Sequence, residues 1–378
     1  MAGYIPFNKP YMTGQETAYI TQAVNSGKIS GNGDYTKKCQ QFFEKRYGFK
    51  KVLLTTSCTD ALEMAALLIN LSPGDEVIMP SYTFVSTANA FVLRGAKIVF
   101  TDCYTDHPNM DADLIEALIT PETKAIVVVH YGGVACDMDK IMELAAKYNI
   151  YVVEDAAQAV DSFYKGKPLG GIGHLAAFSF HETKNVISGE GGMLVVNDER
   201  FVDRSEIIWE KGTNRAAFYR GEVNKYGWVD IGSSFLPSEI VAAFLYAQLE
   251  NIDDIQSRRK KIWSIYYSKL EVLAKQGKVV LPSVHEDATN NAHIFYLLCN
   301  SLDERTGLIE YLKKRNILAV FHYISLHTSE FYKKQHGSRE LTNCDAFTDK
   351  LVRLPLYYEL SDDQVNYVAS CILEFFSE

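Results

Sequence analysis

Short runs of apolar residues recur along the first half of the chain and predict the strands of a sheet. The runs are continuously apolar instead of alternating, which is typical of strands that are buried on both faces. They lie at residues 51–57, 76–81, 97–102, 125–131, 151–157, 176–180 and 192–198. We therefore expect a seven-stranded sheet.

The segments between these runs have apolar residues at helical spacing. We expect helices at residues 59–70, 85–94, 111–118 and 137–148. Strands that alternate with helices form a mostly parallel sheet covered by helices. Residues 1–250 are thus predicted to form a large α/β domain, with residues 1–35 as an irregular segment packed across it.

The pattern changes after about residue 250. A charged stretch with helical spacing, residues 251–277, precedes an apolar run at 292–300. A helix-like segment at 305–316 and a strand-like run at 317–323 follow. This mixture predicts a smaller α+β domain over residues 251–378, joined to the large domain by a long helix.

Composition narrows the class of protein. The 378 residues carry a net charge of −9 and no basic block, which argues against a nucleic-acid partner. The N-terminus lacks the features of a signal peptide and no apolar run is long enough for a membrane span, so we expect a cytoplasmic protein. The cysteines show neither a disulfide framework nor metal-ligand spacing, and no metal is expected. They are Cys39, Cys58, Cys103, Cys136, Cys299, Cys344 and Cys371.

Polar motifs follow five of the predicted strands. They are "TTSCTDAL" after the first strand, "PSYTF" after the second, "HYGG" after the fourth, "EDAAQ" after the fifth and "SFHETKN" after the sixth. In open α/β sheets, ligands bind beyond the carboxyl ends of the strands. We therefore expect all five motifs to meet at one pocket.

Three of these motifs offer complementary chemistry. The segment "TSCTD" leads into a helix, so its backbone N–H groups can bind a phosphate. A desolvated Lys184 can form a Schiff base. Asp155 can keep a heteroaromatic nitrogen protonated, which makes the ring an electron sink. Together they predict a pyridoxal-phosphate site, although Lys184 alone could be a loop lysine and Asp155 a helix cap.

The motif set resembles a known family. The order "TSCTDALEMA", "PSYTFVSTANA", "VVEDAAQ", "FSFHETKN" and "GEGGML" is similar to that of the DegT/DnrJ/EryC1/StrS sugar-nucleotide aminotransferases, from "IPFNKP" to "LPLYYELS". The resemblance implies a fold-type I pyridoxal-phosphate enzyme, similar to aspartate aminotransferase. It also implies L-glutamate as the amino donor, pyridoxamine phosphate as the intermediate form of the cofactor, and a homodimer with shared active sites.

The resemblance further implies roles for individual residues. Lys184 would bond the cofactor and Asp155 would contact its pyridine nitrogen. Gln158 would face the phenolic oxygen of the cofactor, and Phe84 would stack on its ring. The phosphate would be held by Ser179 and by the backbone of Cys58, Thr59 and Asp60.

One stretch departs from many relatives, in which a "GYNYR"-like segment of the partner subunit supplies an asparagine to the phosphate. Here "GSSFLP" places Ser234 at that position and Leu236 in place of the arginine. This departure and "HETKN" most resemble the subgroup that aminates dTDP-4-keto-6-deoxy-D-glucose at C4. That reaction gives the 4-amino-4,6-dideoxygalactose precursor used in enterobacterial common antigen. Relatives that act at C3 tend to carry Tyr-Pro where this chain has His181-Glu182.

His130 is expected to have a structural role. The nucleotide sugar needs contacts beyond those of the cofactor. Candidates for binding the substrate are His181, Lys28, the Gly31/Gly33 turn, Arg215, Arg220, His322 and His327. Amination at C3, a UDP-linked sugar and a sugar-nucleotide-binding protein without turnover stay open as alternatives. The related dehydratases have a histidine where this chain has Lys184, and a dehydrogenase would need a GxGxxG fingerprint that is missing after the first strand.

Overall fold

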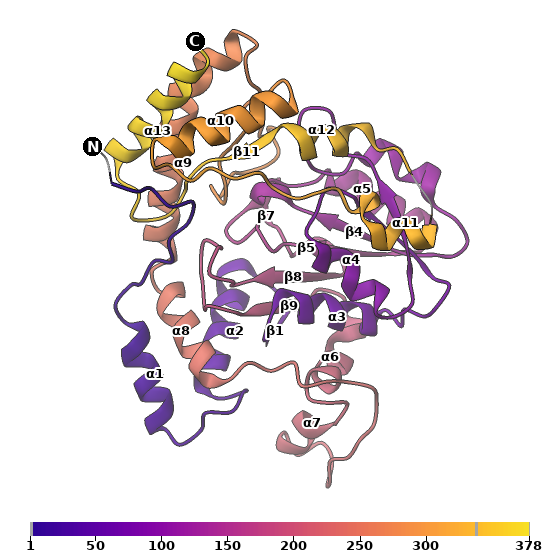
Figure 1. The fold of residues 1–378 in the computed structure, drawn as a ribbon. Helices are drawn as coiled ribbons and strands as arrows, with labels where there is room; N and C mark the ends of the chain where they lie inside the picture. The colour runs from indigo at the N-terminus through magenta and orange to yellow at the C-terminus, as the bar shows by residue number, and fades with distance from the viewer. Residues whose placement is uncertain (1–2, 337–338, 378) are drawn as a thin grey trace.

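A seven-stranded sheet forms the centre of the computed structural model, which describes residues 3–336 and 339–377 (Figure 1). The strand order is β1-β9-β8-β5-β4-β2-β3. Each predicted run overlaps one of these strands, so the prediction of the sheet is confirmed. The strands are β1 (Lys51–Thr55), β2 (Glu76–Pro80), β3 (Lys97–Thr101), β4 (Thr123–Val129), β5 (Tyr151–Asp155), β8 (Leu175–Ser179) and β9 (Gly192–Val196).

The sheet is mostly parallel, as expected. Strands β3, β2, β4, β5 and β8 pair in parallel, and β9 runs antiparallel between β8 and β1. All strands except β9 therefore point the same way. The polar motifs after β1, β2, β4, β5 and β8 accordingly lie along one edge of the sheet.

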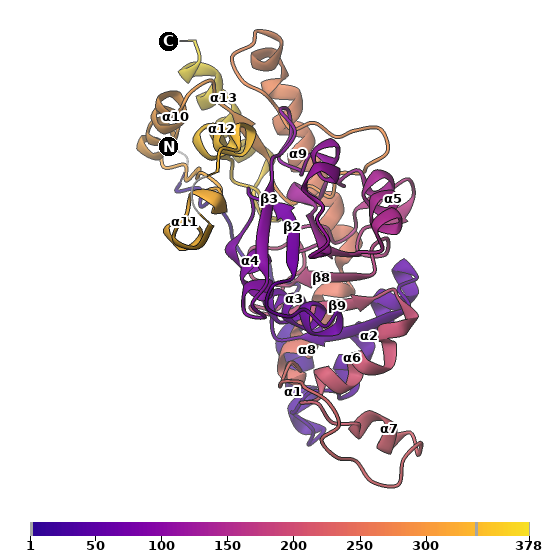
Figure 2. The ribbon, with the colours of Figure 1, turned by 90° about the vertical axis from the view of Figure 1, so that its right-hand side faces the viewer.

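Helices cover both faces of the sheet because its strands are apolar on both sides. In β1, Leu53 packs with α3, whereas Val52 and Leu54 pack with α2. Helices α4 and α5 lie on opposite sides of β2 and β3 (Figure 2). The helices of this part are α1 (Glu16–Asn25), α2 (Asp34–Tyr47), α3 (Cys58–Leu68), α4 (Val85–Val92), α5 (Met138–Tyr148), α6 (Val202–Trp209), α7 (Arg215–Tyr219) and α8 (Glu239–Leu249). Strands β6 (Phe163–Tyr164) and β7 (Lys167–Pro168) form a small antiparallel hairpin.

The C-terminal part packs around a core of its own, to which Ile5 also belongs. Its longest helix, α9, has 24 residues but carries many charges. Across the part of the chain that the structure describes, no helix combines the length and apolar character needed to cross a membrane. The elements of this part are α9 (Ile252–Lys275), β10 (Tyr296–Leu298), α10 (Leu302–Lys314), α11 (Glu330–His336), α12 (Thr342–Lys350), β11 (Leu351–Arg353) and α13 (Asp362–Phe375).

Three local predictions were wrong. The segment 1–35 is not irregular throughout, because it contains α1, which packs against α8, and the first residues of α2. Residues 111–118 form two short 3-10 turns, η1 (Ala112–Leu114) and η2 (Glu116–Leu118), and Pro121 follows closely. The run 317–323 forms no strand and contributes only single-residue bridges to Ile5 and Arg353.

Candidate active site

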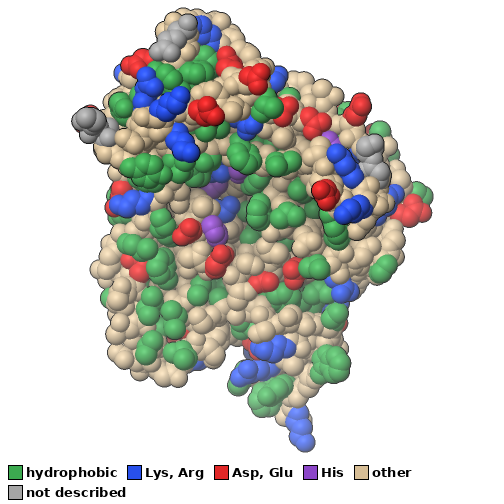
Figure 3. Space-filling view, in the orientation of Figure 1, with side chains coloured by type: hydrophobic (Ala, Val, Ile, Leu, Met, Phe, Trp, Pro, Cys, Tyr) green, Lys and Arg blue, Asp and Glu red, His purple; other side chains and the backbone are tan. Residues whose placement is uncertain are grey.

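A cavity of about 460 Å³ lies beyond the carboxyl ends of β1, β2, β5 and β8. Figure 3 shows a hollow near the centre of this face, with histidine and lysine or arginine side chains in it. Four of the five motifs meet here, as predicted, but no residue of "HYGG", the motif after β4, lines the cavity, so the expectation that all five motifs meet needs correction. Of the predicted site residues, those that line the cavity are Cys58, Thr59, Phe84, Asp155, Gln158, Ser179, His181, Lys184 and His322.

Lys184 lies on the turn after β8 and presents its amine to the cavity. Its backbone N–H donates to the carbonyl of His181 at 2.9 Å, which fixes the start of the side chain. Within residues 3–336 and 339–377, no acceptor or carboxylate pairs with its Nζ. Burial lowers the pKa of Lys184, and Asp155 opposes this shift only in part. Burial therefore favours the neutral amine, which is the form that acts as a base or nucleophile.

Asp155 ends β5 and is buried at the floor of the cavity. Its Oδ2 accepts a hydrogen bond from Thr87 Oγ1 at 2.7 Å, and its Oδ1 accepts one from the N–H of Ala157 at 3.1 Å. Burial raises the pKa of Asp155 despite these two donors. The carboxylate thus lies where a cationic nitrogen on a ligand would stabilise it.

The N-terminus of α3 forms the opposite end of the cavity. Ser57 caps the helix by accepting a hydrogen bond from the N–H of Asp60 at 3.1 Å. The prediction that the Asp60 amide binds phosphate therefore needs correction, because this donor is already used. The backbone N–H groups of Cys58 and Thr59 lie in the first turn of α3, where helix geometry provides no acceptor for them. They can therefore bind an anion such as a phosphate.

Gln158 and Phe84 line the cavity between these two ends. Gln158 Nε2 donates to the hydroxyl of Tyr323 at 3.0 Å, and its Oε1 accepts from the N–H of Gly132 at 2.7 Å. These bonds hold the amide group at the cavity wall. Phe84 is 55% exposed and lies 6.2 Å from the ring of Tyr323, so its ring is available to stack on a planar ligand.

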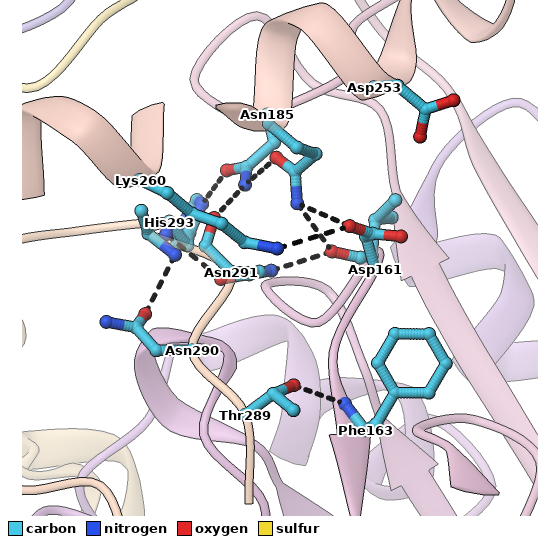
Figure 4. A network of polar contacts seen from close by, with 12 residues as sticks. Asp161, Phe163, Asn185, Asp253, Lys260, Thr289, Asn290, Asn291 and His293 are labelled. Atoms are coloured by element: carbon cyan, nitrogen blue, oxygen red, sulfur yellow. Dashed lines mark hydrogen bonds and ion pairs between the residues drawn. The ribbon is translucent and has the colours of Figure 1, made fainter. Parts of the chain in front are cut away.

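A polar network behind Lys184 fixes the state of His293 (Figure 4). Asn185 Nδ2 donates to Gln256 Oε1 at 2.8 Å and to the carbonyl of Asn291 at 2.9 Å. Its Oδ1 can then only accept, so Nδ1 of His293, 2.9 Å away, must carry the proton. Burial and the nearby Lys184 push the pKa of His293 well below its usual value. The ring is therefore neutral, and its Nε2 is an acceptor.

His181 lies at the cavity wall beside two polar side chains. Its Nδ1 is 2.9 Å from Thr183 Oγ1, and its Nε2 is 3.7 Å from a carboxylate oxygen of Glu190. Its backbone N–H donates to Ser179 Oγ at 3.4 Å. The imidazole is thus positioned to contact a polar ligand.

Several predicted residues lie away from this cavity. His327 is buried with Nδ1 2.7 Å from Ser81 Oγ, so the prediction that it faces the sugar needs correction. His130 is structural as expected, because its Nε2 lies 2.9 Å from a carboxylate oxygen of the buried Glu154. Four further predicted site residues are exposed on the outer surface of this chain and do not line the cavity, namely Lys28, Arg215, Arg220 and Ser234.

Several residues that line the cavity were not singled out as site residues from the sequence. Thr87 belongs to "PSYTFVSTANA", but only the structure shows its bond to the floor of the cavity. His293, Tyr323 and Arg353 come from the C-terminal half of the chain. Arg353 directly precedes "LPLYYELS", which was the one available signal.

The donor set fits pyridoxal phosphate. An unpaired amine, a buried carboxylate and a helix N-terminus face the same cavity, and the group needs a partner for its aldehyde, its ring nitrogen and its phosphate. Residues 10–373 match the model of the DegT/DnrJ/EryC1/StrS aminotransferase family. The chain belongs to this family. It is accordingly a pyridoxal-phosphate-dependent sugar aminotransferase.

Relatives of known sequence match over nearly the whole chain. The spore coat polysaccharide biosynthesis protein SpsC of Bacillus subtilis is 34% identical, over 98% of this chain and 96% of that one. GDP-perosamine synthase of Escherichia coli O157:H7 is 33% identical, over 99% of both chains.

Solved structures of sugar aminotransferases share the fold. The sugar aminotransferase Spr1654 of Streptococcus pneumoniae, described as putative and solved in its pyridoxamine-phosphate form, has a TM-score of 0.91 and 28% identity, covering 99% of both chains. DesV of S. venezuelae, in complex with a ketimine intermediate, has a TM-score of 0.90 and 28% identity, covering 100% of both chains. The fold-type I prediction is thus confirmed.

Proposed function

We propose that this aminotransferase transfers the amino group of L-glutamate to C4 of dTDP-4-keto-6-deoxy-D-glucose. The observation that carries the proposal is the unpaired amine of Lys184 in a cavity whose floor is Asp155. When bound, the cofactor supplies a carbonyl that takes up the amino group and a ring that accepts electrons from the reacting carbon.

Each residue of the cavity has a definite task in this proposal. Lys184 Nζ would take the proton from the carbon that carries the amino group of the donor and give it back later in the same reaction, because burial lowers its pKa and favours the neutral amine. Asp155 holds the ring nitrogen protonated. Gln158 and Phe84 orient the ring, and the first turn of α3 binds the phosphate.

The choice of the C4 ketosugar rests on the resemblance of "HETKN" and "GSSFLP" to the subgroup that aminates C4, and "HETKN" contributes to one wall of the cavity. His181, with Thr183 and Glu190 beside it, offers hydrogen-bonding groups that suit the hydroxyls of a hexose. His322 contributes a further ring, held by the hydroxyl of Tyr131 at 2.6 Å from its Nδ1. A relative whose printed name is a synthase of GDP-perosamine also supports a nucleotide-linked sugar as substrate.

We also infer that the enzyme works as a homodimer with shared active sites. The lobe around α7 projects from the body of the chain, and Trp228 on it is 85% exposed (Figure 1). Its exposed aromatic side chains need a partner surface in water. In this arrangement the surface residues that reach the neighbouring site are Lys28, Arg215, Arg220 and Ser234.

The test is a direct assay of the product. The holoenzyme is incubated with dTDP-4-keto-6-deoxy-D-glucose and L-glutamate, and the sugar ring is analysed by NMR. An amino group on C4 supports the proposal. An amino group on C3, or turnover only with a UDP- or GDP-linked ketosugar, refutes the assigned substrate, and no turnover of any ketosugar favours a binding protein.

The homodimer is tested through Trp228. Light scattering of the wild-type holoenzyme should give twice the mass of one chain, and Trp228→Ser should shift the equilibrium towards monomer with a matching loss of activity. A fully active wild-type monomer would refute the shared site.

A further inference from the structure

Two cysteine side chains meet where the C-terminal part of the chain packs against the sheet. Cys103 lies two residues after the end of β3, and Cys344 lies in the first turn of α12. Their Sγ atoms are 3.2 Å apart, although the residues are 241 positions apart in the chain. Both side chains are fully buried. No atom fits between two sulfurs at this distance, so the two thiols touch each other directly.

Asp102 holds the backbone around the two thiols in place. Its Oδ1 accepts hydrogen bonds from the N–H groups of Cys103 at 2.9 Å and Cys344 at 2.8 Å. Its Oδ2 accepts one from the N–H of Asn343 at 3.1 Å, and Asn343 Nδ2 donates to the carbonyl of Cys103 at 2.8 Å. The first N–H groups of a helix need such acceptors. One carboxylate therefore fixes both cysteine backbones relative to each other.

The sulfur pair needs little movement to become a covalent bond. A disulfide bond is about 2.05 Å long, so the two sulfurs must approach each other by only about 1.2 Å. Groups that a fold keeps in contact react as if they were present at very high concentration. We propose that Cys103 and Cys344 form a disulfide that fastens α12 to the end of β3.

The reaction needs a two-electron oxidant, and we assign this role to a peroxide. One thiol sulfur attacks an oxygen of hydrogen peroxide, the O–O bond breaks, and a sulfenic acid and water form. The second sulfur then attacks the sulfenic sulfur, the S–S bond forms, and the hydroxyl group leaves as water with the proton of the second thiol. The two thiols together lose two electrons, and the peroxide gains them.

Burial determines the rate of this reaction and the lifetime of its product. It raises the pKa of Cys103 well above the usual range, so little thiolate is present at neutral pH and oxidation is slow. The neighbouring Asp102 is only half-buried, which leaves a short path for a small neutral oxidant. A bulky thiol such as glutathione cannot reach the buried sulfurs, so the bond resists reduction. The disulfide is therefore a durable cross-link instead of a rapid switch.

The cross-link acts on the wall of the cavity that comes from the C-terminal part. The carbonyl of Cys344 accepts hydrogen bonds from Ser325 Oγ at 2.9 Å and Thr348 Oγ1 at 3.2 Å. Ser325 follows the cavity residue Tyr323 by two positions, and α12 continues directly into β11, which ends at Arg353. A bond between α12 and the end of β3 thus restrains both segments. Because it also restricts the unfolded chain, it should raise the midpoint of thermal unfolding by roughly 2 to 5 °C.

Mapping of the thiols tests the proposal. The holoenzyme is treated with hydrogen peroxide, unfolded, and alkylated with iodoacetamide without a reductant. Mass spectrometry should show five alkylated cysteines in place of the seven of the reduced protein, and the digest should contain a peptide pair that joins Cys103 to Cys344. Seven alkylated cysteines, a bond to another cysteine, sulfinic acid in place of the bond, or an unchanged unfolding midpoint would overturn the proposal.

Cys371→Ser is the matched control for Cys344→Ser. Cys371 is also buried but lies on α13 within the C-terminal core. After peroxide treatment, Cys371→Ser should keep the cross-link and the higher unfolding midpoint, and Cys344→Ser should lose both. Bound zinc that blocks alkylation of the two thiols until a chelator removes it would assign the pair, with Asp102, to a metal and overturn the proposal. The mapping uses the wild type alone, so it decides the proposal even where a variant does not fold.

Discussion

Replacing Thr87 by valine tests how much its hydrogen bond stabilises the ionised carboxylate of Asp155 at the floor of the cavity. The hydroxyl of Thr87 donates to Asp155 Oδ2 at 2.7 Å and lies 2.8 Å from Thr83 Oγ1, so it is the middle of a short chain of hydrogen bonds. Valine has nearly the same shape as threonine but lacks the donor. Asp155 would then keep only the N–H of Ala157.

The size of the effect follows from the burial of this pair. A hydrogen bond to a buried charged group contributes roughly 1.5 to 3 kcal/mol. The loss disfavours the ionised carboxylate, which is the form that pairs with a protonated ring nitrogen, and so it raises the pKa of Asp155 further. Since 1.4 kcal/mol is a factor of ten, the dissociation constant of pyridoxal phosphate should rise about 10- to 100-fold at neutral pH.

The assay is a titration of apoenzyme with pyridoxal phosphate, followed by absorbance at several pH values. The ratio between variant and wild type should shrink as the pH falls, because Asp155 becomes protonated in both proteins. Thr83→Val is the matched control, since it removes a hydroxyl one step further from the carboxylate, and its effect should be smaller. Equal affinities of Thr87→Val and wild type at neutral pH would refute the role given to this hydrogen bond.

Three further predictions follow from the same geometry. Asp155→Asn should stabilise the apoenzyme at neutral pH, because burial raises the folded pKa of Asp155 above its ordinary value of 3.8 and the wild type therefore loses stability as the pH rises from 3.8 to the folded pKa. Urea titrations across this range should show no such loss in the variant. Gly192→Ala should cost about 1 to 3 kcal/mol in urea unfolding, because its Cβ would collide with the backbone of Ser57 and Cys58 at the start of α3; unchanged stability would contradict this packing. Lys184→Ala should still bind pyridoxal phosphate but should lose amino transfer by several orders of magnitude in single-turnover assays, and wild-type rates would refute its role.

The sheet and one side of the cavity could be predicted because both depend on local pattern. Strands buried on both faces give continuous apolar runs, and parallel strands bring the segments after them to one edge, which placed Asp155 and Lys184 together. The helix α1 was missed because its exposed face is polar and only Glu16 and Ala23 are buried. The division of the chain at residue 250 stays a prediction.

The other side of the cavity could not be predicted from pattern alone. His293, Tyr323 and Arg353 reach the cavity from segments after α9, and nothing in their local sequence indicates which way these segments return to the sheet. His327 shows the same difficulty, since it is five residues from His322 yet is buried beside Ser81 instead of facing the cavity. A histidine or arginine gains its role here only from the tertiary contacts that desolvate it.

The covalent partner of the cofactor is the most direct test of the account. The holoenzyme is reduced with borohydride and digested, and the peptides are sequenced by mass spectrometry. The account predicts a pyridoxyl group on Lys184 and loss of the absorbance near 400 nm. A pyridoxyl group on another lysine, or no labelled peptide from a protein that retains its activity, would contradict it.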